Sequence, residues 1–233
     1  MAARHDPLTG LPNRRRLVEA IEQATKGTHV QQHALFLIDL DRFKPVNDAF
    51  GHETGDLVLC EVAERLKSLT PLGGIAARLG GDEFALVVPC SSRNGLMRLA
   101  EQVIKAIAAP VDCERVHASV GATVGIALYP ENGLTPEALL RCADLAMYRG
   151  KRQGRAAFRF FEQEMDEELR SRASLETSLL SAITKGEIRP HYQPLVSMSD
   201  NSVHGFEVLA RWYHLKRVCS HRMLLFPSRR ILD

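Results

Sequence analysis

The chain has 233 residues, of which 45% are hydrophobic, 25% charged and 6% aromatic, a composition that excludes a fibrous or intrinsically disordered protein. The net charge of +2 is unevenly distributed: in residues 215–233, five Lys or Arg side chains against one Asp give +4, which leaves −2 for residues 1–214. The body of the chain gives no general signal for nucleic-acid binding, so any anion-binding site in it must be local.

The cysteines and the N-terminus bear on the cellular compartment. The five cysteines are odd in number and are never spaced as a CxxC pair, which argues against a disulfide framework or a zinc site and favours a reducing environment. The N-terminal segment MAARHDPLTGLPNRRR lacks the apolar core of a signal peptide, and no run reaches the roughly 18 apolar residues of a membrane span. We therefore expect a cytoplasmic protein without a membrane segment.

The hydrophobic pattern predicts helices and strands in alternation. The continuous apolar run 34–38 is typical of a buried strand, and it ends in Asp39-Leu40-Asp41. Two short strands flank Gly80-Gly81-Asp82-Glu83, which predicts a hairpin with two acids at its tip. In chain order the expected elements are a helix over 13–25, a strand over 34–38, a helix over 59–66, strands over 75–79 and 84–88, a helix over 96–107, a strand over 120–128 and a helix over 138–147.

This order of elements indicates an α+β fold in which helices pack on an antiparallel sheet, and a ferredoxin-like core is expected. Residues 156–161 are available as a strand that closes the sheet, and the acid-rich residues 162–186 predict a connecting helix.

The acids at the strand end and at the hairpin tip are the candidate functional residues. Asp39 and Asp82, with Glu83, are expected at adjacent strand ends, where paired carboxylates suit Mg²⁺, which prefers oxygen ligands and shares them with substrate phosphates. The alternative is that the acids are simply solvated, which is the more common role of an isolated Asp-Glu pair in a turn.

Three separated blocks in a fixed order change this balance. DPLTGLPNR at 6–14, DLDRFKPVNDAFGHETGD at 39–56 and RLGGDEF at 78–84 resemble the GGDEF family of diguanylate cyclases. The resemblance implies a nucleotidyl-cyclase-like GGDEF domain over 1–161 that condenses two GTP molecules into cyclic di-GMP and two pyrophosphates. It also implies two Mg²⁺ ions per active site, for which Mn²⁺ can substitute, and a homodimer, because each domain of this family holds one GTP.

The resemblance assigns metal-binding and catalytic roles. Asp39, Asp82 and the main-chain carbonyl of Leu40 match the positions that hold the magnesium ions. Asp82 also matches the residue that helps to deprotonate the attacking 3′-hydroxyl, and Glu83 belongs to the same catalytic group. Lys44 matches a cation that stabilises the transition state, in which negative charge develops on the phosphoryl oxygens.

The substrate contacts implied by the resemblance lie in two places. Asn47 and Asp56 match the pair that reads the guanine edge, and His52 matches a further substrate contact. Lys151 and Arg155 match the contacts to the terminal phosphates, although a basic cluster after a helix is, by itself, more often a complement to the helix dipole. Without their fixed offsets from the strand, the histidine and the asparagine would be ordinary loop or cap residues.

The chain departs from the family pattern in two places that matter for function. Ala156 stands where the family often has Asn. Pro71 and Gly74 stand where many members carry an RxxD site that binds the product, so feedback inhibition through that site is not expected.

The C-terminal part carries a second resemblance. Residues 179–214, which include YQP and EVLAR, resemble the opening of an EAL domain, a cyclic di-GMP phosphodiesterase with a β/α-barrel fold, and Glu207 matches its motif glutamate. Such a barrel needs about 250 residues, so residues 187–214 are expected to be a truncated EAL start, an incomplete barrel fragment without phosphodiesterase activity. Residues 215–233 leave the pattern. A frameshifted or truncated reading frame, or a basic tail that binds membranes or nucleic acid, would explain them.

Two functions remain open from the sequence, besides the alternative of a gene fragment that folds but serves no role. The first is a diguanylate cyclase, which the intact acids of the motif favour. The second is a non-catalytic GTP-binding module that regulated a phosphodiesterase.

Overall fold

The computed structural model describes residues 4–25, 32–90, 92–113 and 116–213. It divides into two compact units, Met1–Asp166 and Glu167–Asp233, and each is described by itself.

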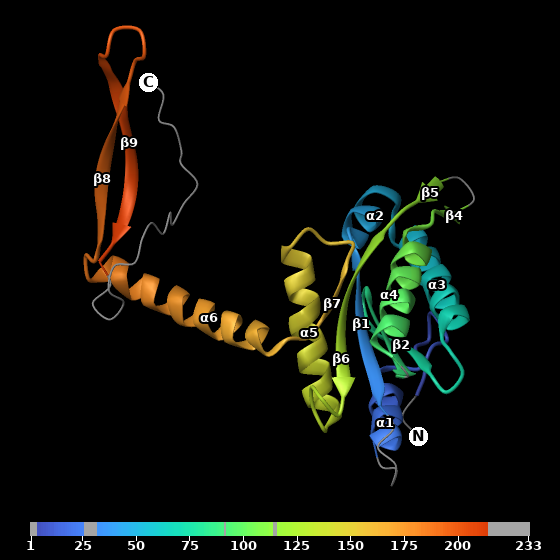
Figure 1. Cartoon of the computed structure of the whole chain (residues 1–233). Coiled ribbons are helices and arrows are strands. Elements are labelled where there is room, and N and C mark those ends of the chain that lie inside the picture. Colours follow the sequence, from blue (N-terminus) through green and yellow to red (C-terminus); the bar gives the residue numbers. More distant parts are fainter. Residues whose placement is uncertain (1–3, 26–31, 91, 114–115, 214–233) are drawn as a thin grey trace. The chain divides into compact units, whose positions relative to one another are not determined.

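The first unit is built on a five-stranded sheet (Figure 1). Its strands, in spatial order, are β2 (Ile75–Gly80), β3 (Glu83–Pro89), β1 (His33–Asp41), β6 (Gly121–Tyr129) and β7 (Phe158–Phe160). The central strand β1 is antiparallel to β3 on one side and to β6 on the other. The expectation of a wholly antiparallel sheet is wrong at the edge, where β7 runs parallel to β6. The helix α5 (Pro136–Arg152) connects these two strands, and a helical crossover of this kind returns the chain in the same direction.

Helices cover both faces of the sheet (Figure 1). One face packs against α1 (Arg14–Thr25) and α5, and the other packs against α2 (Phe43–Phe50), α3 (His52–Leu69) and α4 (Arg93–Ala108). Alternate residues of β1 therefore enter different core clusters: Phe36 and Ile38 belong to one, and Leu35 and Leu37 to the other. Burial on both faces explains why this strand reads as a continuous apolar run.

The structure contains three short elements that the sequence pattern did not predict. One is α2, an eight-residue helix with Pro45 in its first turn, where proline is tolerated. The others are β4 (Val111–Cys113) and β5 (Val116–Ala118), which form a separate two-stranded sheet. The remaining predicted helices and strands of this unit are present. Their ends differ by up to seven residues, the largest difference being the start of α3, which begins at His52.

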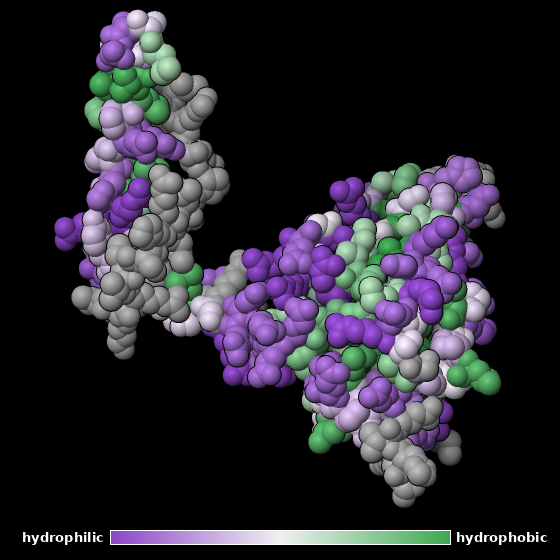
Figure 2. All heavy atoms as spheres, viewed as in Figure 1, coloured by the Kyte–Doolittle hydropathy of each residue, from purple (hydrophilic) through white to green (hydrophobic). Residues whose placement is uncertain are grey.

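From Gln163 onward, the chain forms a helix and one hairpin. The helix α6 (Gln163–Thr184) lies where a connecting helix was expected. The strands β8 (Ile188–Val196) and β9 (Val203–Trp212) pair antiparallel, and Figure 2 shows apolar side chains exposed on this hairpin. The described residues thus give a two-stranded hairpin and do not support a partial barrel. Residues 215–233 lie outside the described part of the chain.

No helix within the described ranges is both long enough and apolar enough to cross a membrane.

Candidate active site

The hairpin tip that carries the motif acids is held against the end of β1. Gly80 pairs with Glu83, and Gly81 and Asp82 form the two-residue turn between them. Gly81 has φ +53° and Gly80 has φ +143°, backbone conformations that residues other than glycine rarely adopt. The main-chain N–H of Leu40 donates to the carbonyl of Asp82 over 3.2 Å. This hydrogen bond places the turn beside the strand end that carries Asp39.

A second set of contacts fixes the tip from behind. The Arg78 guanidinium donates to the Gly81 carbonyl through Nε (3.1 Å) and Nη2 (2.8 Å). Its Nη1 forms an ion pair of 2.9 Å with Asp6, and both side chains are largely buried. Burial opposes ionisation of Asp6, but hydrogen bonds from Thr9 and Arg78 outweigh it and lower the pKa of the carboxyl group. The DPLTG block at residues 6–10 thus connects directly to the turn.

The carboxylates gather around the end of β1. Burial raises the pKa of Asp39, and the nearby charges of Asp82 and Asp41 add to this rise, while Lys151 opposes it. Burial also raises the pKa of Glu83, together with the charges of Asp39, Asp144 and Asp82, and Lys151 again opposes the rise. Asp39, Asp82 and Glu83, predicted from two distant blocks, therefore form one electrostatic cluster.

Lys151 reaches this cluster because α5 lies close against β6. A Cβ atom at Gly125 would collide with the carbonyl of Ala143, and one at Gly150 would lie 2.8 Å from Thr123 Cγ2, so glycine is needed at both places. The last turn of α5 is thereby carried toward β1. Lys151 Nζ lies 2.6 Å from Asp39 Oδ2.

Asp41 is a functional candidate that the sequence analysis placed only as the end of a strand. Its side chain is 6% exposed. It accepts hydrogen bonds from Thr123 Oγ1 (2.8 Å to Oδ2) and from the N–H of Ala156 (3.0 Å), and it pairs with Arg155 Nε at 3.8 Å. Its spacing of two residues from Asp39, which puts both side chains on one face of the strand, is the signal that could have identified it.

Asp41 holds a loop with an unusual backbone. Gly154, Arg155 and Ala156 have φ values of +125°, +62° and +47°. Two of these residues carry side chains, for which the left-handed region costs energy. The hydrogen bond and ion pair to Asp41 offset that cost and keep Arg155 beside the strand end.

The residues expected to read guanine lie on α2 and α3. Phe43 and Val46 are buried and anchor α2, which begins directly after β1. Gly51, with φ +85°, separates the two helices. A Cβ atom at Gly55 would collide with Asn47 Oδ1, so this glycine makes room for the Asn47 side chain.

The other residues of this group point to solvent. Lys44, His52 and Asp56 are exposed. Within the described residues no hydrogen bond or ion pair joins them to the carboxylate cluster, so the structure does not bring these three side chains together with the acids.

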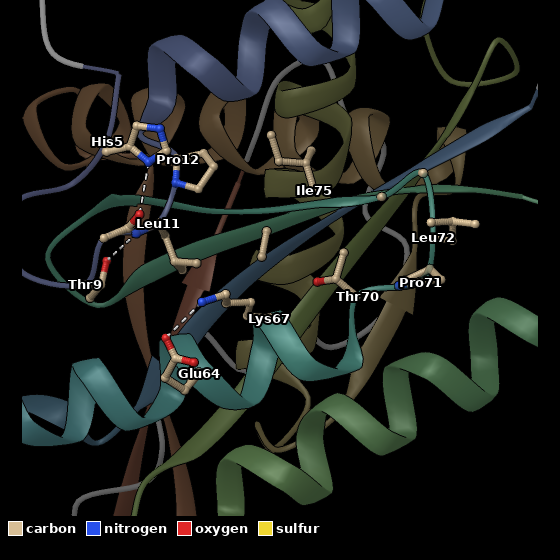
Figure 3. A pocket seen from close by; sticks show the side chains of 14 residues that line it. His5, Thr9, Leu11, Pro12, Glu64, Lys67, Thr70, Pro71, Leu72 and Ile75 are labelled. Atoms are coloured by element: carbon tan, nitrogen blue, oxygen red, sulfur yellow. Dashed lines mark hydrogen bonds and ion pairs between the residues drawn. The ribbon is translucent and has the colours of Figure 1, made fainter.

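An open pocket of about 660 Å³ lies elsewhere in the first unit (Figure 3). It is lined by the segment His5–Pro12, by the end of α3 and by the turn that contains Pro71 and Gly74. Lys67 and Glu64 form an ion pair of 3.4 Å at its wall. The acids of the cluster do not line it, so this cavity is separate from the candidate active site.

The donors present fit a hard divalent cation. No group of three or more His, Cys, Asp or Glu side chains in the described ranges is arranged to hold a metal. The donor set would therefore consist of two carboxylates, Asp39 and Asp82, with the Leu40 carbonyl, which points to the same strand edge as the Leu40 N–H. All of these donors are oxygens, as Mg²⁺ prefers, and substrate phosphates would complete the coordination.

The first unit thus combines an α+β fold, a mixed five-stranded sheet and an acidic Gly-Gly hairpin beside an acidic strand end. Residues 3–157 match the family model described as "Diguanylate cyclase, GGDEF domain", so the chain belongs to the GGDEF family.

Relatives support this assignment. The chain is 45% identical over 168 residues to the diguanylate cyclase TpbB of Pseudomonas aeruginosa, covering 69% of this chain and 38% of TpbB. It is 41% identical over 216 residues to MucR of the same organism, named a bifunctional diguanylate cyclase/cyclic di-GMP phosphodiesterase, and 32% identical over 214 residues to the cyclic di-GMP phosphodiesterase NbdA. These matches cover 91% of this chain in both cases, but only 31% of MucR and 27% of NbdA.

A solved structure of the GGDEF domain of TpbB from P. aeruginosa superimposes with a TM-score of 0.66 at 42% identity. It covers 71% of this chain and 99% of that domain. The fold of the first unit is therefore that of a GGDEF domain.

Proposed function

We propose that the chain is a Mg²⁺-dependent diguanylate cyclase that joins two GTP molecules into cyclic di-GMP as a homodimer. The observation that carries the proposal is the cluster of Asp39, Asp82, Glu83 and Lys151 in a domain of the cyclase family. The 45% identity to TpbB, which is named a diguanylate cyclase, supports it.

Each residue of the cluster has a task in the proposed reaction. Asp39, Asp82 and the Leu40 carbonyl would hold the metal ions, which, when bound, offset charge on the phosphoryl oxygens and make the 3′-hydroxyl more acidic. The 3′-oxygen of one GTP attacks the α-phosphorus of the other, the hydroxyl proton passes to Asp82 or Glu83, and pyrophosphate leaves. The raised pKa of Glu83 suits a proton acceptor.

Substrate selection falls to groups around the cluster. Asn47 and Asp56 offer an amide and a carboxylate that complement the donors and acceptors of the guanine edge. Lys44, Lys151 and Arg155 supply positive charge for the phosphates. His52 is proposed as a further contact.

A homodimer follows from the stoichiometry of the reaction. One GGDEF domain offers one such site, and two bound GTP molecules must face each other. The reaction takes place twice between the same two nucleotides, once at each α-phosphorus, and the second bond closes the ring of cyclic di-GMP.

A second function is supported by the relatives named as phosphodiesterases. The MucR match of 216 residues is longer than the 155 residues of the family model, so it extends into the segment beyond the GGDEF domain. We propose that residues 187–214 correspond to the start of an EAL domain. In this second function the chain is a GTP-binding module that regulates such a domain and does not itself convert GTP.

The experiment that separates the two functions is product analysis at different protein concentrations. Purified protein is incubated with GTP and Mg²⁺, and cyclic di-GMP is quantified by chromatography. A cyclase gives product whose amount per molecule of protein rises with protein concentration, because the active species is a dimer. GTP binding without any product at micromolar protein would favour the regulatory module.

A further inference from the structure

Lys151 forms an ion pair with the carboxylate of Asp39, which the proposed function assigns to a metal ion. Its Nζ lies 2.6 Å from Asp39 Oδ2, and the two side chains are only 31% and 14% exposed. Lys151 also opposes the rise in the pKa of Glu83, so its charge acts on a second acid of the cluster besides Asp39. In the structure, an ammonium group thus supplies the positive charge that these acids require.

The ammonium group and a metal ion cannot both hold Asp39 in this way. Mg²⁺ sits about 2.0–2.1 Å from its carboxylate ligands. A second cation within hydrogen-bond distance of the same oxygen would repel it strongly in a partly buried site, where charges are screened less than in water. Metal binding must therefore release the lysine from Asp39.

The released lysine needs another anion. Lys151 stands in the last turn of α5, and Arg155 lies in the loop that follows this helix. The resemblance to the family assigns both residues to the terminal phosphates of GTP. A phosphate group can accept the ammonium that the metal displaces. Without nucleotide, the displaced charge has no such partner and opposes metal binding.

We propose that Lys151 is a resident counter-ion of Asp39 and that it makes metal binding conditional on the nucleotide. The metal binds weakly to the free protein and tightly to the GTP complex. In the complex, Lys151 forms an ion pair with the phosphates, and the Asp39 carboxylate is then available to the metal. By linkage, the metal must then strengthen GTP binding by the same factor. This inference rests on the proposed function, since it uses the metal and phosphate assignments.

The test is a calorimetric titration of the full chain with Mg²⁺ or Mn²⁺ alone. Lys151→Met should bind the metal at least about tenfold more tightly than the wild-type protein when nucleotide is absent. The matched control is Arg152→Met, which removes one positive charge from the neighbouring exposed residue of the same helix. It should stay within about twofold of the wild type.

Two additions make the result specific. The gain should disappear in the double variant Lys151→Met/Asp39→Asn, because the freed carboxylate is then absent. With a non-hydrolysable GTP analogue present, the advantage of Lys151→Met should shrink or reverse, because the wild-type lysine now serves the phosphates. If Lys151→Met does not fold, Lys151→Gln removes the charge while keeping a polar side chain of similar length.

The outcomes are distinguishable from a failure of the proposed function. Equal metal affinity of the wild type and the charge-removing variants, or tight metal binding by the wild type without nucleotide, would overturn the counter-ion role and leave a cyclase intact. No metal binding in any variant, even with the analogue, would overturn the metal site and the cyclase proposal with it. The titration needs no turnover, so its result does not depend on whether cyclic di-GMP is made.

Discussion

Asp41 offers the sharpest test of how the site is held together, because its carboxylate is buried and joins three parts of the chain. It accepts hydrogen bonds from Thr123 and from the N–H of Ala156, and it pairs with Arg155. Asp41→Ala removes all of these contacts and leaves the Thr123 hydroxyl, which is fully buried, without this partner. Breaking such a network commonly costs about 3–5 kcal/mol.

Two milder variants grade the effect. Asp41→Asn keeps one acceptor oxygen and should cost about 2 kcal/mol, since a hydrogen bond to a charged group contributes about 1.5–3 kcal/mol. Thr123→Val keeps the shape of the side chain and the contacts of Asp41 with the loop. It should cost about 1 kcal/mol.

The assay must report on the first unit. The single tryptophan, Trp212, lies in β9, so its fluorescence reports on the hairpin. Hydrogen exchange at the amides of β1 and β6, monitored as a function of urea concentration, measures the free energy of unfolding of the first unit. A loss below about 1 kcal/mol for Asp41→Ala would refute the view that this carboxylate fastens the loop.

The other predictions concern the loop, the hairpin tip and the C-terminal segment. Ala156→Gly should raise the free energy of unfolding by about 1 kcal/mol, because φ is +47° at this residue; equal or lower stability in urea would contradict the strain. The pKa of Asp6 is lowered from its ordinary value of 3.8, so its stabilising contribution is present above that pH and is lost as the pH falls below it. Acid unfolding should therefore be less steep in Asp6→Asn, and identical acid profiles would count against the ion pair with Arg78. Limited proteolysis should cut between Glu162 and Gly186 and spare residues 5–160 with their GTP chemistry, because an isolated strand pair is marginally stable in water. Glu207→Ala should leave that chemistry unchanged, and a protease-resistant C-terminal fragment would show that the hairpin is covered by a partner surface.

Local patterns were sufficient to predict the central elements of the fold. β1 was visible because both of its faces are buried, which leaves an unbroken apolar run. The hairpin was visible because two glycines stand where the turn needs unusual φ values. The direction of β7 was not predictable from the sequence pattern. Whether two strands run parallel depends on the path of the chain that connects them, and hydrophobic periodicity does not contain that path.

The site was predictable in its acids and not in its contacts. Asp39 and Asp82 were identified from strand ends and from the family motif. The partners of Asp41 in its hydrogen bonds, Thr123 and Ala156, lie 82 and 115 positions away from it in the sequence. No local sequence pattern contains such a pairing. The same holds for the ion pair between Lys151 and Asp39, which depends on the close packing of α5 against β6. The helix α2 was overlooked because it is short and contains a proline.

The measurement that tests the central claim most directly is the formation of cyclic di-GMP from GTP and Mg²⁺ by the wild-type protein and by Asp39→Asn and Asp82→Asn, side by side at micromolar protein. The account predicts product from the wild type and about a hundredfold less from each variant, since loss of one such charge-stabilising interaction costs on the order of 3 kcal/mol. No product from a folded wild-type protein that binds GTP, or near-normal turnover by either variant, would contradict it.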